Sequence, residues 1–137
     1  MIVLSVILLL VLLAGALALG AVAFLGLRGT LRRNSRVGVR TAASMRSDEA
    51  FTVANKVAAP TTAAGAFFLL IGAVATMAPG GLFGVVAAVL TTVAALATAA
   101  YGGSMGNRAA EAMPAGDAGG CGHSCISCSF KDACAPS

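Results

Sequence analysis

The residues whose types and spacing best suit chemistry are four cysteines near the end of the chain. They follow the pattern Cys121-x3-Cys125-x2-Cys128-x5-Cys134, and the one histidine, His123, lies between the first two. In a reducing compartment, four thiolates this close together suit one tetrahedral zinc ion or an iron–sulfur cluster. In an oxidising compartment the same cysteines would pair as disulfides. The spacing alone leaves a metal site, disulfides and free thiols open, so the compartment must be inferred from the rest of the chain.

The rest of the chain is too apolar for a soluble domain. Of the 137 residues, 58 % are hydrophobic and 10 % are charged, whereas an average soluble domain is about one quarter charged. Residues 1–27 and 58–107 contain no Asp, Glu, Lys, Arg or His. A helix crosses the hydrocarbon core with about 20 apolar residues, so the first stretch predicts one span and the second predicts two. We expect an all-α, polytopic membrane protein.

A cluster of helix-breaking residues, Pro79–Gly81, divides the second stretch. Helices are therefore predicted at 2–27, 59–78 and 82–104. The predicted organisation is a first transmembrane helix at 1–27, a basic loop with a short helix at 28–58, a transmembrane hairpin at 59–104, a linker at 105–120 and an irregular Cys-rich tail at 121–137.

The distribution of positive charge predicts the topology. Seven of the nine basic residues lie between the first two predicted spans, and short loops rich in Lys and Arg stay on the cytoplasmic side. We expect a multi-pass protein of the plasma membrane with its N-terminus outside and its C-terminus in the cytoplasm. A cytoplasmic tail would keep its cysteines reduced, which favours the metal site. Disulfides in the tail would imply the inverted topology.

The predicted spans carry no sign of catalysis or transport. An ionisable residue inside a span is the usual sign of a functional path, and both apolar stretches lack one. The sequence has no nucleophile–base pair and no phosphate-binding loop. The arginines of the basic loop have no interleaved aromatic residues, so nucleic acid is not an expected partner. We expect a non-enzymatic protein.

The basic loop contains a signal for the start of a helix. A capping serine followed by two acids, Ser47–Glu49, suits a helix N-terminus, where a hydroxyl and negative charge are stabilising. The pattern predicts a short interfacial helix over 48–58, with Pro60 in the first turn of the next helix. Arg40 is expected to form an ion pair with one of the two acids and so fix the loop.

The loop also resembles a known sequence signature. An Asn is followed by Gly-hydrophobic-Arg-Thr, then by a Ser-acidic step, an aromatic residue and a polar residue one turn on. The matching positions are Asn34, Gly38, Val39, Arg40, Thr41, Ser47, Asp48, Glu49, Phe51 and Asn55. The stretch is similar to the SdpI family of small bacterial membrane proteins, over roughly residues 20–104. The family usually has Trp at the position of Phe51 and often His at that of Asn55. The bias toward Ala, Gly and Arg is typical of an actinobacterial type of source.

The resemblance implies immunity against a secreted toxin peptide, coupled in the best-known member to sequestering a repressor at the membrane. On this basis we expect a membrane protein that acts through protein–protein contacts of its cytoplasmic loop and tail. The expected partners are the lipid bilayer and other membrane protein subunits. The candidate interaction residues are Asn34, Gly38, Arg40, Thr41, Asp48, Glu49, Phe51 and Asn55, and the candidate metal ligands are the four cysteines. The alternative is an accessory subunit of a larger membrane complex, such as a respiratory assembly, with a metal- or disulfide-stabilised tail.

Overall fold

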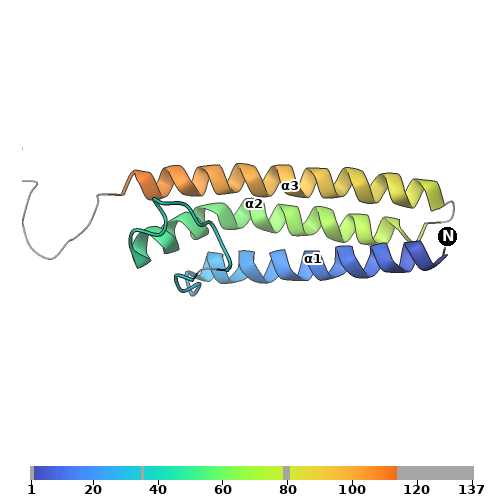
Figure 1. Cartoon of the computed structure of the whole chain (residues 1–137), viewed down its shortest axis with the longest axis horizontal. Helices are drawn as coiled ribbons and strands as arrows, with labels where there is room; N and C mark the ends of the chain where they lie inside the picture. Colours follow the sequence, from blue (N-terminus) through green and yellow to red (C-terminus); the bar gives the residue numbers. More distant parts are fainter. Residues whose placement is uncertain (1, 35, 79–80, 114–137) are drawn as a thin grey trace, which may run out of the picture.

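The computed structural model describes residues 2–34, 36–78 and 81–113. These residues form three α-helices and no strand: α1 (Ile2–Arg28), α2 (Asp48–Ala75) and α3 (Gly81–Glu111). The helices lie side by side, with α2 between α1 and α3 (Figure 1). Each is long enough and apolar enough to cross a membrane, since even the 27 residues of α1 extend about 40 Å at 1.5 Å per residue. The chain is an all-α, multi-pass membrane protein, as predicted.

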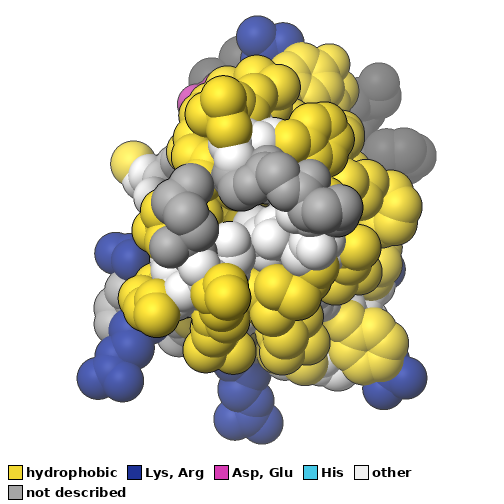
Figure 2. Space-filling view, turned by 90° about the vertical axis from the view of Figure 1, so that its right-hand side faces the viewer, with side chains coloured by type: hydrophobic (Ala, Val, Ile, Leu, Met, Phe, Trp, Pro, Cys, Tyr) yellow, Lys and Arg dark blue, Asp and Glu magenta, His cyan; other side chains and the backbone are white. Residues whose placement is uncertain are grey.

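The helices bury small side chains and expose large apolar ones. Ala73 and Ala95 are 1 % and 2 % exposed, whereas Phe67 and Leu90 are 61 % and 64 % exposed. Viewed from the end of the bundle that holds the start of α1, hydrophobic side chains form most of the outline, and Lys and Arg side chains project beyond it (Figure 2). In lipid, burying large apolar groups brings little advantage, and close packing of small residues drives helix association. This surface is suited to contact with lipid chains.

Glycine at the helix contacts allows the backbones to approach closely. A Cβ atom on Gly65 of α2 would lie 3.1 Å from the Ala95 carbonyl oxygen of α3. A Cβ atom on Gly26 of α1 would lie 3.0 Å from the Asn55 carbonyl oxygen of α2. Because α2 contacts both neighbours while α1 and α3 scarcely meet, α2 is the central helix of the bundle.

The short interfacial helix predicted over 48–58 is the first part of α2, and the predicted break before Pro60 does not occur. Proline lacks the N–H group that an interior helical residue donates, so it usually ends or kinks a helix in water. In a transmembrane helix, hydroxyl groups help to compensate for the bonds that proline disturbs. Thr61 and Thr62 both donate to the Ala58 carbonyl oxygen, at 2.8 and 2.9 Å.

The linker predicted to begin at residue 105 is also corrected, because α3 continues to Glu111. The Asn107 amide donates to the Glu111 carboxylate at 2.7 Å, which is a stabilising contact between residues one turn apart. Arg108 lies in the last turn, where positive charge suits the helix C-terminus. Residues 114–120 of the predicted linker and the Cys-rich tail lie outside the described residues.

The second predicted helix ends at Ala75 rather than at residue 78, and α3 begins at Gly81, one residue before its predicted start. Thr76 caps the C-terminus of α2, and its hydroxyl donates to the Ala73 carbonyl oxygen at 2.6 Å. The described helices are thus joined antiparallel, with the loop between α1 and α2 at the opposite end of the bundle (Figure 1).

Candidate functional site

The segment between α1 and α2, residues 29–47, is called here the inter-helix loop. It folds back over the start of α2 and lies beside the C-terminal part of α3 (Figure 1). Ala43 of the loop is buried in a cluster with Ala50 and Ala54 of α2 and Ala110 of α3. This apolar contact holds the middle of the loop against the bundle.

The centre of the loop is bound to the side chain of Asn55. This residue lies on α2 and is only 5 % exposed. Its Oδ1 atom accepts a hydrogen bond from the Val39 amide at 2.7 Å, and its Nδ2 atom donates to the Phe51 carbonyl oxygen at 2.8 Å. Gly38 precedes this contact with φ of 97°, a conformation that L side chains rarely adopt. A Cβ atom at Gly38 would also collide with the Asn55 oxygen, so both residues are needed for this arrangement.

A second set of hydrogen bonds closes the turn from Thr41 to Ser44. The Thr41 amide donates to Ser44 Oγ at 2.9 Å, and the Ser44 amide donates to Thr41 Oγ1 at 3.2 Å. The Ser44 hydroxyl, which is fully buried, donates to the Val39 carbonyl oxygen at 2.8 Å. This reciprocal pairing resembles a helix capping box and satisfies the buried polar groups of the turn.

The first part of the loop is shaped by Asn34. Its Oδ1 atom accepts hydrogen bonds from the Arg36 and Val37 amides, at 2.9 and 2.8 Å. Its Nδ2 atom donates to the Arg32 carbonyl oxygen at 2.8 Å. An Asn side chain that bonds to nearby backbone in this way stabilises a local turn. Asn34 therefore has a structural role in the loop.

Two arginines tie the loop to the helix ends. Arg33 Nε lies 3.0 Å from the Asp48 carboxylate, and its Nη1 atom donates to the Met45 carbonyl oxygen at 3.0 Å. Arg46 Nη2 donates to the Ala110 carbonyl oxygen at 3.2 Å, which lies in the last turn of α3. A free carbonyl at a helix C-terminus is a favourable acceptor for a positive group.

Among the described residues, Asp48 forms its ion pair with Arg33. We predicted that Arg40 would pair with Asp48 or Glu49, so this prediction is wrong. Asp48 is the shared partner, but the loop's path brings Arg33 beside it. Arg40 and Glu49 are both exposed and make no side-chain hydrogen bond or ion pair with other described residues.

The predicted helix start is confirmed. Ser47 is the N-cap of α2, and its hydroxyl accepts a hydrogen bond from the Ala50 amide at 3.0 Å. Asp48 and Glu49 occupy the first turn, where negative charge is stabilising. One turn later, Phe51 is fully buried.

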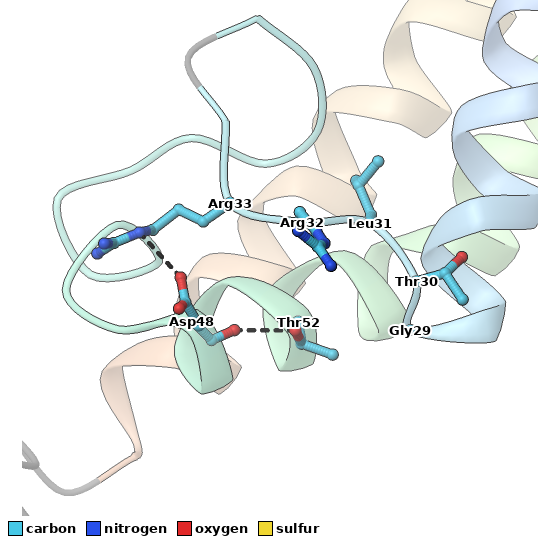
Figure 3. A pocket seen from close by; sticks show the side chains of 7 residues that line it. All are labelled: Gly29, Thr30, Leu31, Arg32, Arg33, Asp48 and Thr52. Atoms are coloured by element: carbon cyan, nitrogen blue, oxygen red, sulfur yellow. Dashed lines mark hydrogen bonds and ion pairs between the residues drawn. The ribbon is translucent and has the colours of Figure 1, made fainter.

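A polar pocket of about 350 Å³ lies where α1 passes into the loop (Figure 3). Residues 29–33 of the loop, together with Asp48 and Thr52 of α2, line it. The Thr52 hydroxyl donates to the Asp48 carbonyl oxygen at 2.8 Å. The Arg33–Asp48 ion pair lies at one side of the pocket, and Arg32 is exposed next to it. The pocket offers positive charge and hydrogen-bonding groups but no nucleophile with an adjacent base.

The eight predicted interaction residues divide into supports and contact candidates. Phe51 and Asn55, where the chain departs from the resembled signature, are buried and joined by a hydrogen bond. The other six residues lie at partly buried or exposed positions: Asn34, Gly38, Arg40, Thr41, Asp48 and Glu49. The four cysteines and His123 lie outside the described residues.

Sequence reasoning missed three supporting residues: Ser44, Arg33 and Arg46. The Thr-x-x-Ser spacing of Thr41 and Ser44 is a detectable capping signal. Arg33 and Arg46 have no such signal, because several arginines in the same loop are equivalent by sequence alone.

Comparison with known proteins identifies the family. The model of the SdpI/YfhL protein family matches residues 30–102, which is more than half of the 137-residue chain. The match includes the inter-helix loop from Thr30, all of α2 and most of α3. No curated protein and no solved structure gives a significant match. The chain belongs to the SdpI/YfhL protein family.

Proposed function

We propose that this membrane protein is of immunity-protein type and acts without catalysis, through contacts that its inter-helix loop makes with another protein. The family match includes the whole loop beyond Gly29 and suggests this class of function. The observation that carries the proposal is the hydrogen-bonded loop itself. A segment that only connected two helices would not need a buried side chain, Asn55, to fix its centre.

The loop's arginines divide into two groups. Arg33 and Arg46 bond to the helix ends and so position the loop. Arg32, Arg36 and Arg40 are exposed on the loop that the first group positions. A fixed array of guanidinium groups suits a partner with carboxylates or phosphates, because arginine binds these groups in a defined geometry. We therefore expect the partner surface to be acidic.

The cytoplasm is the proposed side for the loop and the C-terminal tail. The eight basic residues at this end that the structure describes are all exposed: Arg28, Arg32, Arg33, Arg36, Arg40, Arg46, Lys56 and Arg108. Their concentration at one end of the bundle supports this orientation through the positive-inside rule. An impermeant thiol reagent should fail to label Cys134 in intact cells and should label it after the cells are permeabilised and any tail metal is removed with a chelator. Labelling of intact cells would reject this orientation.

Survival of toxin-sensitive cells tests the immunity proposal. Cells that produce this protein should resist the secreted toxin peptide against which the best-known family member gives immunity. The double variant Arg32→Ala/Arg40→Ala should lose resistance at equal expression. The control Arg28→Ala/Arg108→Ala removes the same charge from α1 and α3 and should keep resistance. Equal loss of resistance in both variants would indicate that the arginines of the loop only set the membrane topology.

The same cells distinguish the alternative, an accessory subunit of a larger complex. Purification of the full chain in mild detergent should yield the protein without a large assembly in fixed ratio. Recovery of a respiratory or similar complex at constant stoichiometry would favour the accessory role and contradict independent action.

A further inference from the structure

A second cavity, separate from the polar pocket, opens between α1 and α3. This membrane crevice has a volume of about 370 Å³ and is lined by all three helices and by residues 36–39 of the loop. Because α1 and α3 scarcely meet, α2 forms its floor through Ala58 and Ala59. Val22 of α1 and Ala99 of α3 lie on its walls. The crevice is thus a gap in the bundle that the three helices do not fill.

Gly103 shows that the crevice has room for an additional group. A Cβ atom on Gly103 would meet nothing within 4 Å. The neighbouring Gly102 differs, since a Cβ atom there would collide with the Thr61 hydroxyl. The side of α3 that lines the crevice is therefore open, whereas the adjacent side packs closely on α2.

The chemistry of the lining is divided along its length. Its helical walls come from the apolar part of the spans and are mainly small aliphatic residues. At the loop end the lining includes Arg36, which is exposed, and the buried Asn55. Of the described residues, none that lines the crevice is acidic. An occupant should therefore have an apolar tail and an anionic head.

We propose that the membrane crevice binds one anionic phospholipid, with an acyl chain between α1 and α3 and the phosphate beside Arg36. Phospholipid is the occupant that fits this position, because an apolar gap between transmembrane helices is reached directly from the bilayer. Basic pockets between transmembrane helices are common sites for anionic headgroups. The guanidinium of Arg36 supplies paired donors for phosphate oxygens. The proposal does not depend on the immunity function.

Native mass spectrometry of the full chain in mild detergent tests the proposal. The probes are phosphatidylglycerol and phosphatidylcholine with identical acyl chains, added at equal concentrations. The wild-type protein should retain one phosphatidylglycerol in preference to phosphatidylcholine. Gly103→Leu should abolish this retention by filling the crevice, and leucine is a better helix former than glycine, so α3 should remain intact. Circular dichroism checks that the helices are retained.

Two control variants make the test specific. Ala100→Leu adds a side chain to an exposed position of α3 that does not line the crevice, and it should retain the lipid. Arg36→Gln should weaken phosphatidylglycerol binding about fivefold, from the roughly 1 kcal/mol that one basic residue contributes. Arg40→Gln, outside the crevice lining, should have no such effect. Undiminished retention by Gly103→Leu, equal loss in Ala100→Leu, or equal retention of the two lipids by the wild type would each overturn the proposal.

Discussion

The contact between α2 and α3 and the contact between the loop and α2 are stabilised in different ways. Along α2 and α3, glycine and alanine let the backbones approach, as at Gly65 and Ala95. In the loop, individual polar atoms are paired, as at Val39 and Asn55. Packing of small residues sets the distance between two helices. The same kind of contact recurs along their length, so it does not select one arrangement. Directional hydrogen bonds specify one arrangement, so the described residues of the loop present a defined surface.

The largest expected effect is that of Gly38→Val. A side chain at this position would require an unfavourable positive φ and would displace the Asn55 oxygen. Strain and the lost hydrogen bond together should lower the stability of the folded loop by about 3 kcal/mol. Thermal unfolding in detergent and proteolysis of the loop measure the change. Ala100→Val, at an exposed position of α3 outside the crevice lining, is the control and should leave both unchanged.

Gly65→Leu tests the helix contact in the same way. Its side chain would collide with α3, where the Ala95 carbonyl oxygen lies 3.1 Å from a Cβ position. Overpacking of this kind should lower the free energy of unfolding by about 2 kcal/mol. The loop should keep its amide protection, since ten residues of α2, about 15 Å at 1.5 Å per residue, separate Gly65 from Asn55. Loss of loop protection in this variant would show that the two contacts are not independent.

A small effect is expected for Arg33→Ala. The Arg33 and Asp48 side chains are 41 % and 81 % exposed, and exposed ion pairs contribute about 0.5 kcal/mol. A double-mutant cycle with Asp48→Ala should give a coupling of that size that falls as salt is added. A second cycle that combines Arg40→Ala with Asp48→Ala should give no coupling. A larger coupling in the Arg40 cycle would support the ion pair between Arg40 and Asp48 that the sequence predicts.

The smallest effect on the helices is expected from the cysteine tail. Replacing Cys125 and Cys128 together by serine should release one equivalent of bound zinc, or bleach an iron–sulfur cluster, because thiolate ligands hold such metals. The unfolding of α1–α3 should not change. Elemental analysis and the absorption spectrum of the pure protein measure the metal. A metal-free wild-type protein with two disulfides would reject the site and the cytoplasmic placement of the tail.

The helices could be predicted from the sequence because the bilayer imposes a simple requirement on them. Two charge-free stretches and one breaker cluster were enough to place the three spans, and Ser47 marked the start of α2. The continuation of α2 through Pro60 was missed, since the rule for proline in water differs from that in lipid. The end of α3 was missed because its last turns are polar while still helical.

The site could be predicted only as a set of residues. The signature included Gly38 and Asn55. It did not indicate that the Asn55 side chain bonds to the Val39 amide, 16 positions away. The bond from Arg46 to Ala110 spans 64 positions. Such pairings depend on how the loop returns to the bundle, and residue types along a single chain do not record that path.

Hydrogen–deuterium exchange at the Val39 amide tests most directly that the loop is a fixed element held by Asn55. The full chain in lipid nanodiscs should show strong protection of this amide. Asn55→Leu should remove most of it, whereas Thr52→Val, which deletes a different hydrogen bond to the backbone of α2, should leave it. Exchange of the wild-type Val39 amide at the rate of an unstructured peptide would contradict the account, as would undiminished protection in Asn55→Leu.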